Sequence, residues 1–318
     1  MELRQLAAIA AVADHGTFSA AADALGTVQS NVSAHVARLE RELGVVLFDR
    51  SRGDLTEEGK VVVTRARHVL SEVEALVSDV AAVRNDVSGT VRVGVIGTTG
   101  RWLAPRLLAA TAERYPAVRI AVVEGSSVVL AGQLDSGKLD MAVTNLPVTE
   151  SDVTVERLFD EDLVLVVARS DPLAGREEID LSDLRDLPLL LPMPGTAFRH
   201  EIDAATVPAG FELVAKAELD GVRFIASLTF EGYGPAILPA TAVPGFLRDR
   251  WAPVPVRGLP RRQVGLAVRR RAVLSAPARA VRDLLGEVVA DQVMSGGSPG
   301  LHPPTSDGSG SARPGPRP

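Results

Sequence analysis

The chain has no cysteine among its 318 residues. That absence excludes a disulfide scaffold, a thiolate zinc site, an iron–sulfur cluster and a catalytic cysteine, and it excludes the sensing of oxidants through a thiol. No apolar run approaches the roughly 18 residues of a membrane span, and the first residues lack the basic and apolar pattern of a signal peptide. We therefore expect a soluble, cytoplasmic protein.

Motifs of catalysis and metal binding are also missing. No G-x-S-x-G elbow occurs, and Gly94, Gly97 and Gly100 have the wrong spacing for a dinucleotide-binding loop. The five histidines are scattered without the spacing of metal ligands: His15, His35, His68, His200 and His302. We expect no enzymatic activity, no metal and no cofactor.

The charge balance gives little support for a nucleic-acid partner. Lys and Arg number 34 and Asp and Glu number 40, so the net charge is −6. On bulk charge alone this argues mildly against nucleic-acid binding. The length suggests two or three domains, and an apolar content of 46% is ordinary for a globular protein.

Four regions differ in pattern. Residues 1–59 are short helices separated by glycines, 60–88 form one stretch without Gly or Pro, and 89–294 alternate strand-like apolar runs with amphipathic helices. Such alternation predicts a largely parallel sheet covered by helices. Residues 295–318 are rich in Gly, Pro and Ser, and we expect them to be disordered. The expected strands are Val91–Ile96, Arg119–Val123, Asp140–Thr144, Leu163–Ala168 and Val264–Val268, and the clearest expected helices are 103–114 and 128–137.

The first region contains the pattern of a helix-turn-helix. An Ala-rich helix from Phe18 ends at Gly26, which is free to take the left-handed conformation. In the helix that follows, apolar residues at spacings of four, three and four predict one buried stripe: Val32, Val36, Leu39 and Leu43. The remaining face carries hydrogen-bonding groups that suit base edges in a major groove: Gln29, Ser30, Asn31, Ser33, His35 and Arg38.

A wing follows this motif. Residues 43–59 predict a short strand, a turn around Gly53, a return strand and a new helix capped by Thr56. Arg50 and Arg52 lie where a wing contacts the DNA backbone or the minor groove. For these arginines and for the helix residues, the alternative interpretation is ordinary exposed surface.

The run Phe18–Gly59 contains A-A-x-A-L-G, Q-S-x-V-S-x-x-V-x-x-L-E, E-L-G-x-x-L-F-x-R and L-T-x-x-G at fixed spacing. This pattern resembles the LysR-type transcriptional regulators and is more specific than a bare helix-turn-helix. One departure is Val28, where the family has Ser or Thr, so this helix either starts at Thr27 or lacks a side-chain cap.

The resemblance implies an α/β protein with a winged helix-turn-helix at 1–59, a dimerising linker helix at 60–88 and an effector-binding domain at 89–294. The effector domain is expected to be periplasmic-binding-protein-like, with two Rossmann-like α/β subdomains, I at about 90–162 and 264–294 and II at about 163–263. The implied partners are double-stranded DNA at an operator, a small-molecule effector bound between the subdomains, and a second copy of the chain in a homodimer or homotetramer. RNA polymerase is a further candidate.

The N-terminal region is nearly neutral where it is expected to meet DNA. From Thr27 to Arg52 there are four arginines and three acidic residues. DNA binding must therefore depend on a few placed arginines, on helix N-terminal amides and on duplication in a dimer.

The linker region has an unbroken heptad pattern. Its apolar residues recur at alternating spacings of four and three: Val62, Ala66, Val69, Val73, Leu76, Val80, Val83 and Val87. A stripe this narrow favours pairing with a second helix. The alternative is a long helix that lies on the protein's own core.

Loops after the strand-like runs carry small hydroxyls and arginines where ligands collect in open α/β sheets. Hydroxyls and amides at helix N-termini suit a carboxylate or another anion. With the resemblance, the expected effector contacts are Thr98, Thr99, Arg101, Ser126, Ser127, Thr144, Thr196 and Arg199. The alternatives are helix capping for the hydroxyls and surface ion pairs for the arginines.

Two other functions fit parts of this pattern. One is a solute-binding module whose N-terminal region serves assembly only. The other is a regulator without an effector, whose α/β domain serves oligomerisation. A polar row opposite a buried stripe, over Gln29–Arg38, is not needed by an assembly helix and favours the DNA-binding regulator.

Overall fold

The computed structural model describes residues 1–84, 86–148, 152–270 and 272–305. The chain divides into two compact units. The first unit comprises 1–144, 148–156 and 266–286, and the second comprises 145–147, 157–265 and the residues from 287 onward. This division groups the N-terminal region and the linker with part of the effector domain, so the domain boundaries at 59, 88 and 294 remain predictions.

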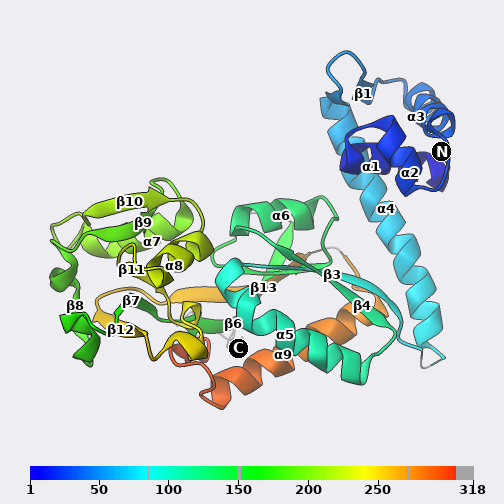
Figure 1. The fold of residues 1–318 in the computed structure, drawn as a ribbon. Helices are drawn as coiled ribbons and strands as arrows, with labels where there is room; N and C mark the ends of the chain where they lie inside the picture. Colours follow the sequence, from blue (N-terminus) through cyan, green and yellow to red (C-terminus); the bar gives the residue numbers. More distant parts are fainter. Residues whose placement is uncertain (85, 149–151, 271, 306–318) are drawn as a thin grey trace, which may run out of the picture. The chain divides into compact units, whose positions relative to one another are not determined.

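The N-terminal part of the first unit is a three-helix bundle with a small wing (Figure 1). Residues from all three helices and from the wing form one core that includes Ile9, Ala21, Val36 and Leu47. The elements are α1 (Leu3–His15), α2 (Phe18–Ala24), α3 (Gln29–Leu43), β1 (Phe48–Asp49) and β2 (Asp54–Leu55). The predicted helix-turn-helix and wing are therefore present.

Helix α4 (Glu57–Ala82) begins at the predicted cap, because the hydroxyl of Thr56 accepts a hydrogen bond from Gly59 N. Gly59 has no room for a side chain, since a Cβ there would lie 2.0 Å from the carbonyl oxygen of Leu47. The first seam residues pack on the N-terminal core, where Ala66 is buried. The later ones are exposed on the surface: Val69, Val73, Leu76, Val80 and Val83.

The predicted linker helix is longer than the observed one. α4 ends at Ala82, and the amides of Arg84 and Asp86 both bond to the carbonyl of Ala81, which turns the chain toward β3. Val83 and Val87 therefore lie beyond the helix. The heptad pattern could not reveal this end, because apolar spacing continues into the turn.

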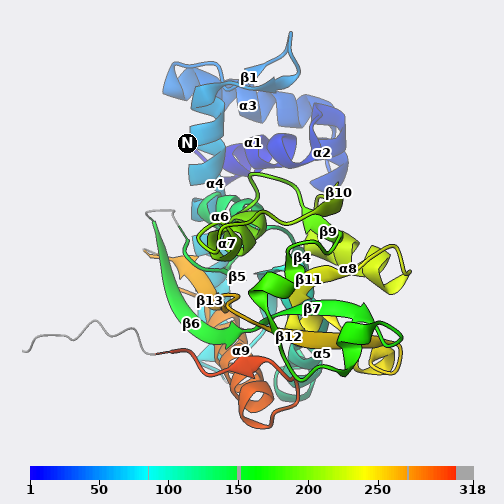
Figure 2. The same cartoon turned by 90° about the vertical axis from the view of Figure 1, so that its left-hand side faces the viewer.

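A six-stranded sheet has the order β14-β6-β13-β5-β3-β4, and β3 pairs in parallel with β4 and β5. Figure 2 labels β4, β5, β6 and β13 of this sheet. Its strands are β3 (Gly89–Val95), β4 (Val118–Glu124), β5 (Met141–Asn145), β6 (Val153–Glu161), β13 (Arg262–Arg269) and β14 (Leu301–His302). The helices of this part are α5 (Gly97–Arg114), α6 (Ser127–Asp135) and α9 (Ala276–Met294). α5 begins six residues before the predicted 103, because Gly100 N already bonds to the carbonyl of Ile96.

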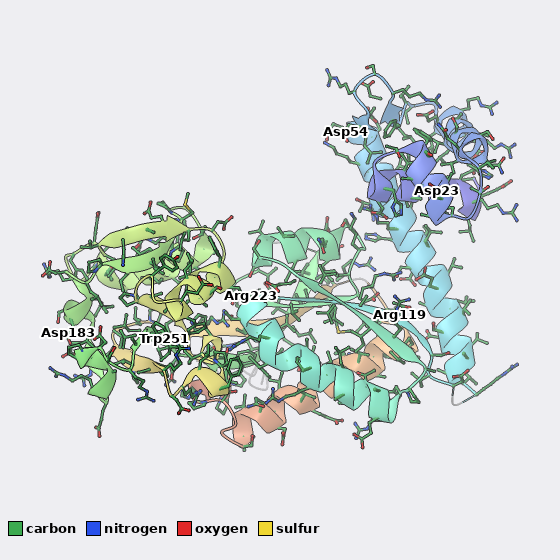
Figure 3. The ribbon with its side chains drawn as sticks, viewed as in Figure 1. Asp23, Asp54, Arg119, Asp183, Arg223 and Trp251 are labelled. Carbon is green, nitrogen blue, oxygen red and sulfur yellow. The ribbon has the colours of Figure 1, made fainter. Side chains whose placement is uncertain are left out.

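The second unit is built on a four-stranded sheet of order β11-β7-β12-β8 and a parallel pair, β10-β9. Alternate residues of β7 pack into different cores, with Leu165 on one side and Val166 on the other. Trp251 is buried and meets Phe230 edge to face, with ring centroids 6.0 Å apart (Figure 3). The elements are β7 (Leu163–Ala168), β8 (Ile179–Asp180), β9 (Leu189–Pro192), α7 (Ala197–Thr206), β10 (Ala215–Leu219), α8 (Val222–Phe230), β11 (Ala236–Pro239) and β12 (Trp251–Arg257), with short 3-10 turns at Pro172–Gly175, Leu181–Leu184, Ala240–Ala242 and Gly245–Leu247.

The predicted disorder of 295–318 is wrong for the first part of that segment. Leu301 and His302 form β14, which pairs antiparallel with β6, and Leu301 is buried. His302 Nε2 lies 2.7 Å from a carboxylate oxygen of Asp162, and Thr305 N donates to Asp160. One buried leucine and a strand edge outweigh the polar composition that predicted disorder. Residues 306–318 lie outside the described residues.

Within the described residues, no helix is long and apolar enough to cross a membrane.

Candidate DNA-binding surface and effector loops

Helix α3 separates a buried side from a polar one. Val32, Val36 and Leu39 are fully buried against the N-terminal core. The predicted reading residues lie on the other side: Gln29, Ser30, Asn31 and Arg38 are exposed, and Ser33 and His35 are half-buried. The first turn contains no acidic residue, so the helix N-terminus keeps its positive partial charge.

The turn between α2 and α3 is held by local hydrogen bonds. The hydroxyl of Thr17 caps α2, and Gly26 has the left-handed backbone (φ 63°) that was predicted. α3 begins at Gln29 with Val28 as N-cap, and no side chain caps it. Asn31 Nδ2 donates to Thr27 Oγ1 at 3.0 Å, so one predicted reading residue already has a partner beside the turn.

The wing is attached to α3 by two contacts that the sequence pattern did not reveal. Glu40 Oε1 accepts hydrogen bonds from the amides of Leu47 (2.8 Å) and Phe48 (3.3 Å), which fixes the start of β1 against the helix. Arg50 Nη2 donates to Ser33 Oγ at 3.2 Å. Glu40 is thus a positioning residue, and its signal in the sequence is the glutamate that ends the motif Q-S-x-V-S-x-x-V-x-x-L-E.

The arginines of this surface are lightly engaged. Within the described residues, Arg38 has no hydrogen bond or ion pair. Arg50 bonds to a neutral hydroxyl and lies 5.5 Å from the centre of the Phe18 ring. The side chain of Arg52 is 84% exposed, and its Nε is 3.7 Å from Asp49. Such guanidinium groups can bind phosphate without first breaking a strong internal pair.

Five predicted effector residues follow neighbouring strands of the six-stranded sheet. Thr98 and Thr99 lie in the first turn of α5 after β3, and both are buried. Thr144 is buried near the end of β5, the parallel neighbour of β3. Ser126 and Ser127 follow β4, on the other side of β3. Parallel strands bring their carboxyl ends to one edge, so these hydroxyls share that edge of the first unit.

The alternative roles for these side chains were helix capping for the hydroxyls and surface ion pairs for the arginines. Ser126 caps α6 by accepting a hydrogen bond from Val129 N. Arg101 is exposed on α5.

Thr196 and Arg199 belong to the second unit, at the start of α7. Thr196 Oγ1 caps this helix and donates to the carbonyl of Met193 at 2.8 Å. The Arg199 guanidinium contacts the carboxylates of Asp203 (2.9 Å) and Glu218 (3.1 Å). Burial alone would lower the pKa of Arg199, but these carboxylates raise it. Arg199 is therefore held in an internal network, which favours the ion-pair alternative over an effector countercharge.

A buried charged cluster of the second unit was missed by sequence reasoning. Arg262 bonds to Glu161 at 2.5 Å, with both side chains almost fully buried, and Thr241 N donates to the same carboxylate. Glu201 of α7 has a buried Oε2 that finds no hydrogen-bond partner in the described part of the chain. Burial raises the pKa of this carboxyl, opposed by the charge of Arg262. No sequence signal connects these residues, because they are 21 to 101 positions apart.

Within the same described residues, no three His, Asp or Glu side chains are gathered as ligands of a metal ion.

Two family models match the chain. Residues 3–60 match the family described as "Bacterial regulatory helix-turn-helix protein, lysR family", and residues 84–290 match "LysR substrate binding domain". The first match covers the bundle and wing, and the second covers the greater part of both sheets. Together the two matches identify these regions as the DNA-binding and effector-binding domains of one regulator, and not as an enzyme.

Similar proteins agree with these matches. A "Probable hydrogen peroxide-inducible genes activator" of Streptomyces viridosporus is 34% identical over 91% of this chain and 95% of that protein. The "DNA-binding transcriptional dual regulator OxyR" of Escherichia coli is 32% identical over 85% of this chain and 90% of that protein. The solved structure of a full-length OxyR variant from Pseudomonas aeruginosa superimposes with a TM-score of 0.73 at 28% identity, over 91% of this chain and 94% of that one. The chain therefore belongs to the LysR family of DNA-binding transcriptional regulators with an effector-binding domain.

Proposed function

We propose that this regulator reads its operator with the polar side of α3 and holds the DNA backbone with its wing. The observation that carries the proposal is the division of α3 into a fully buried apolar side and an exposed polar side without acidic residues in its first turn. The reading residues are Gln29, Ser30, Asn31, Ser33, His35 and Arg38, and the backbone contacts are Arg50 and Arg52. Arg50 supports both roles, because its bond to Ser33 joins the wing to the reading helix.

Fluorescence anisotropy on a fragment selected from the host genome tests this proposal. Gln29→Ala should weaken binding to that fragment more than binding to a scrambled duplex, since a base-reading side chain discriminates between sequences. Arg52→Ala should weaken both about equally and reduce the salt dependence. Unchanged affinity in both variants would rule out this surface.

We further propose that the effector is a small molecule bound without covalent chemistry, at the hydroxyl-rich loops. The relatives are named for induction by hydrogen peroxide, but this chain has no cysteine that a peroxide could oxidise. The expected contacts are Thr98, Thr99, Arg101, Ser126, Ser127, Thr144 and Thr196. Arg199, also predicted from the sequence, would contact the effector only by leaving the carboxylates of Asp203 and Glu218. Amides and hydroxyls at the starts of α5, α6 and α7 support an anionic effector.

Thermal-shift screening of small carboxylates and aromatic acids tests the effector proposal, because a ligand that binds the native state raises the Tm by mass action. Thr196→Val should reduce the shift caused by a true effector. Treatment with hydrogen peroxide should leave operator affinity unchanged. A peroxide-dependent loss or gain of affinity would contradict the proposal.

The regulator is proposed to work as an oligomer in the cytoplasm, joined through the exposed seam of α4. Val69, Val73, Leu76 and Val80 leave a continuous apolar stripe on that helix. Replacing Leu76 with Asp should shift the mass measured by light scattering toward the monomer. RNA polymerase is a proposed further partner, which an in vitro transcription assay at the selected fragment would test.

A further inference from the structure

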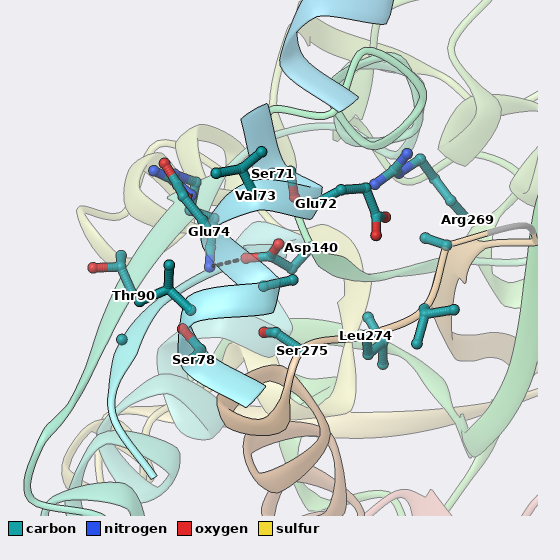
Figure 4. Close-up of a pocket in the computed structure, with 16 residues that line it drawn as sticks. Ser71, Glu72, Val73, Glu74, Ser78, Thr90, Asp140, Arg269, Leu274 and Ser275 are labelled. Atoms are coloured by element: carbon teal, nitrogen blue, oxygen red, sulfur yellow. Dashed lines mark hydrogen bonds and ion pairs between the residues drawn. The ribbon is translucent and has the colours of Figure 1, made fainter. Parts of the chain in front are cut away.

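A cavity of about 410 Å³ lies between α4 and the beginning of the six-stranded sheet, within the first unit (Figure 4). One wall is formed by residues of α4: Ser71–Ala75, Val77 and Ser78. The opposite wall is formed by Gly89, Thr90 and Arg92 of β3, by Asp140, and by the segment from Ala272 to Ser275 after β13. The cavity is separate from the α3 surface and from the effector loops described above.

Two contacts anchor α4 on either side of the cavity. On one side, His68 Nε2 donates to the carbonyl of Asp135 at 2.9 Å. On the other, Asp79 Oδ1 accepts a hydrogen bond from Ala276 N at 2.6 Å, at the start of α9. His68 and Asp79 are eleven positions apart, which corresponds to about 16 Å of helix. α4 is thus held at both ends of a gap that its own side chains do not fill.

Asp140 lies at the floor of the cavity with its charge poorly compensated. Its Oδ2 accepts a hydrogen bond from the backbone amide of Arg92 at 2.7 Å, and the Arg92 guanidinium instead faces Glu74 at 3.5 Å (Figure 4). Burial raises the pKa of Asp140, and the charge of Glu74 adds to this effect, while Arg92 and Arg269 oppose it. A positive group placed near Asp140 would restore the balance.

Several lining groups are available to a ligand. Within the described residues, the side chains of Ser71, Glu72, Ser78, Thr90 and Arg269 form no hydrogen bond or ion pair. The charged lining consists of Glu72, Glu74 and Asp140 against Arg92 and Arg269, a net charge of −1. The volume is in the range of small-molecule sites, and its hydroxyls and carboxylates match an ammonium group, which donates up to three hydrogen bonds.

We propose that this cavity binds a small aliphatic amine of net positive charge, with its ammonium group between Asp140 and Glu72. Because α4 supplies one wall and the effector domain the other, the bound amine holds the linker helix against that domain. The site is thus a second, independent input to the regulator, and it does not depend on the effector proposed above.

Titration of the full-length protein with 1,4-diaminobutane and with L-lysine tests the proposal. Both should raise the Tm saturably, and succinate should not. Hydrogen exchange with either amine should slow in peptides covering 71–78 and 89–92. Asp140→Asn keeps the acceptor for the Arg92 amide but removes the charge, and it should weaken binding about tenfold or more. Glu72→Gln should weaken binding as well.

Two control variants separate this site from others. Glu113→Gln removes an exposed carboxylate of α5 outside the cavity and should leave amine binding unchanged. Thr196→Val, at the proposed effector loops, should also leave it unchanged. The proposal is overturned if neither amine shifts the Tm, or if the shift is the same in Asp140→Asn and Glu72→Gln as in the original protein.

Discussion

Arginine is used in opposite ways in the N-terminal region and in the second unit. Arg50 in the wing bonds to a serine hydroxyl and lies beside the Phe18 ring, and the side chain of Arg52 is almost fully exposed. In the second unit, Arg262 is buried against Glu161, and Arg199 contacts two carboxylates. The same side chain is left available in one region and held in ion pairs in the other.

The difference follows from solvation. A guanidinium removed from water needs a carboxylate and several hydrogen bonds to recover its hydration energy, and breaking such a pair leaves a buried charge. An exposed arginine gains little from a surface partner and loses little without one. Buried, paired arginines such as Arg262 therefore stabilise the fold, whereas exposed arginines such as Arg52 can contact DNA at almost no cost in stability.

The largest effect is expected from Arg262→Ala. It leaves the Glu161 carboxylate fully buried without its partner and removes the positive charge that faces Glu201. The unfolding free energy should fall by about 3–5 kcal/mol, measured by urea denaturation. The double variant Arg262→Met with Glu161→Leu should recover part of that loss, since neither member of the ion pair is then left as a buried, unpaired charge. If Arg262→Ala were as stable as the original protein, the proposed distinction between buried, paired arginines and exposed arginines would be wrong.

Arg38→Ala should affect DNA binding and not stability. Loss of a base or phosphate contact weakens operator affinity about ten- to hundredfold, while an exposed substitution changes the unfolding free energy by no more than about 0.5 kcal/mol. The matched control is Arg41→Ala on the same helix, where Arg41 Nε bonds to the carbonyl of Ala37. Equal losses of affinity in both variants would mean that α3 contributes only general positive charge.

Glu201→Gln tests the buried cluster through pH. The pKa of Glu201 is raised in the folded protein, so the folded state favours the protonated carboxyl, and this contribution to stability is lost as pH rises through the folded pKa. The variant should have a higher Tm than the original protein at neutral pH, and the difference should disappear in acid. Melting curves from about pH 4 to pH 8 check this, with the exposed Glu212→Gln as control. A difference in Tm between the two proteins that does not change with pH would contradict the interpretation that Glu201 is a buried carboxyl whose charge destabilises the fold.

The sequence predicted the features that depend on local spacing. The stripe of Val32, Val36, Leu39 and Leu43 identified the buried side of α3, although Leu43 in the last turn is exposed, and Thr56 identified the start of α4. Each of these needs only residues a few positions apart, since helix periodicity and capping are local.

Features that join distant segments could not be predicted. Glu40 holds the wing through the amides of Leu47 and Phe48, and Arg262 meets Glu161 from 101 positions away. β14 forms because a strand edge is available at β6, although its own composition predicted disorder. In each case the partner is set by the tertiary fold, and the single sequence carries no trace of the pairing.

The smallest expected effect concerns the N-terminus of α3. Val28 occupies the N-cap position with an extended backbone and 59% exposure, and its side chain offers no acceptor to the first amides of the helix. Val28→Ser supplies that acceptor without losing core packing and should raise the unfolding free energy by about 0.5–1 kcal/mol, measured by urea denaturation. Val28→Ala, which lacks a hydroxyl, should not. If the added cap stabilises the helix but weakens operator binding, the backbone amides of this first turn contact DNA, as the exposed arginines are proposed to do. If operator affinity is unchanged, the arginines and the polar side chains of α3 contact the operator without any contribution from these amides.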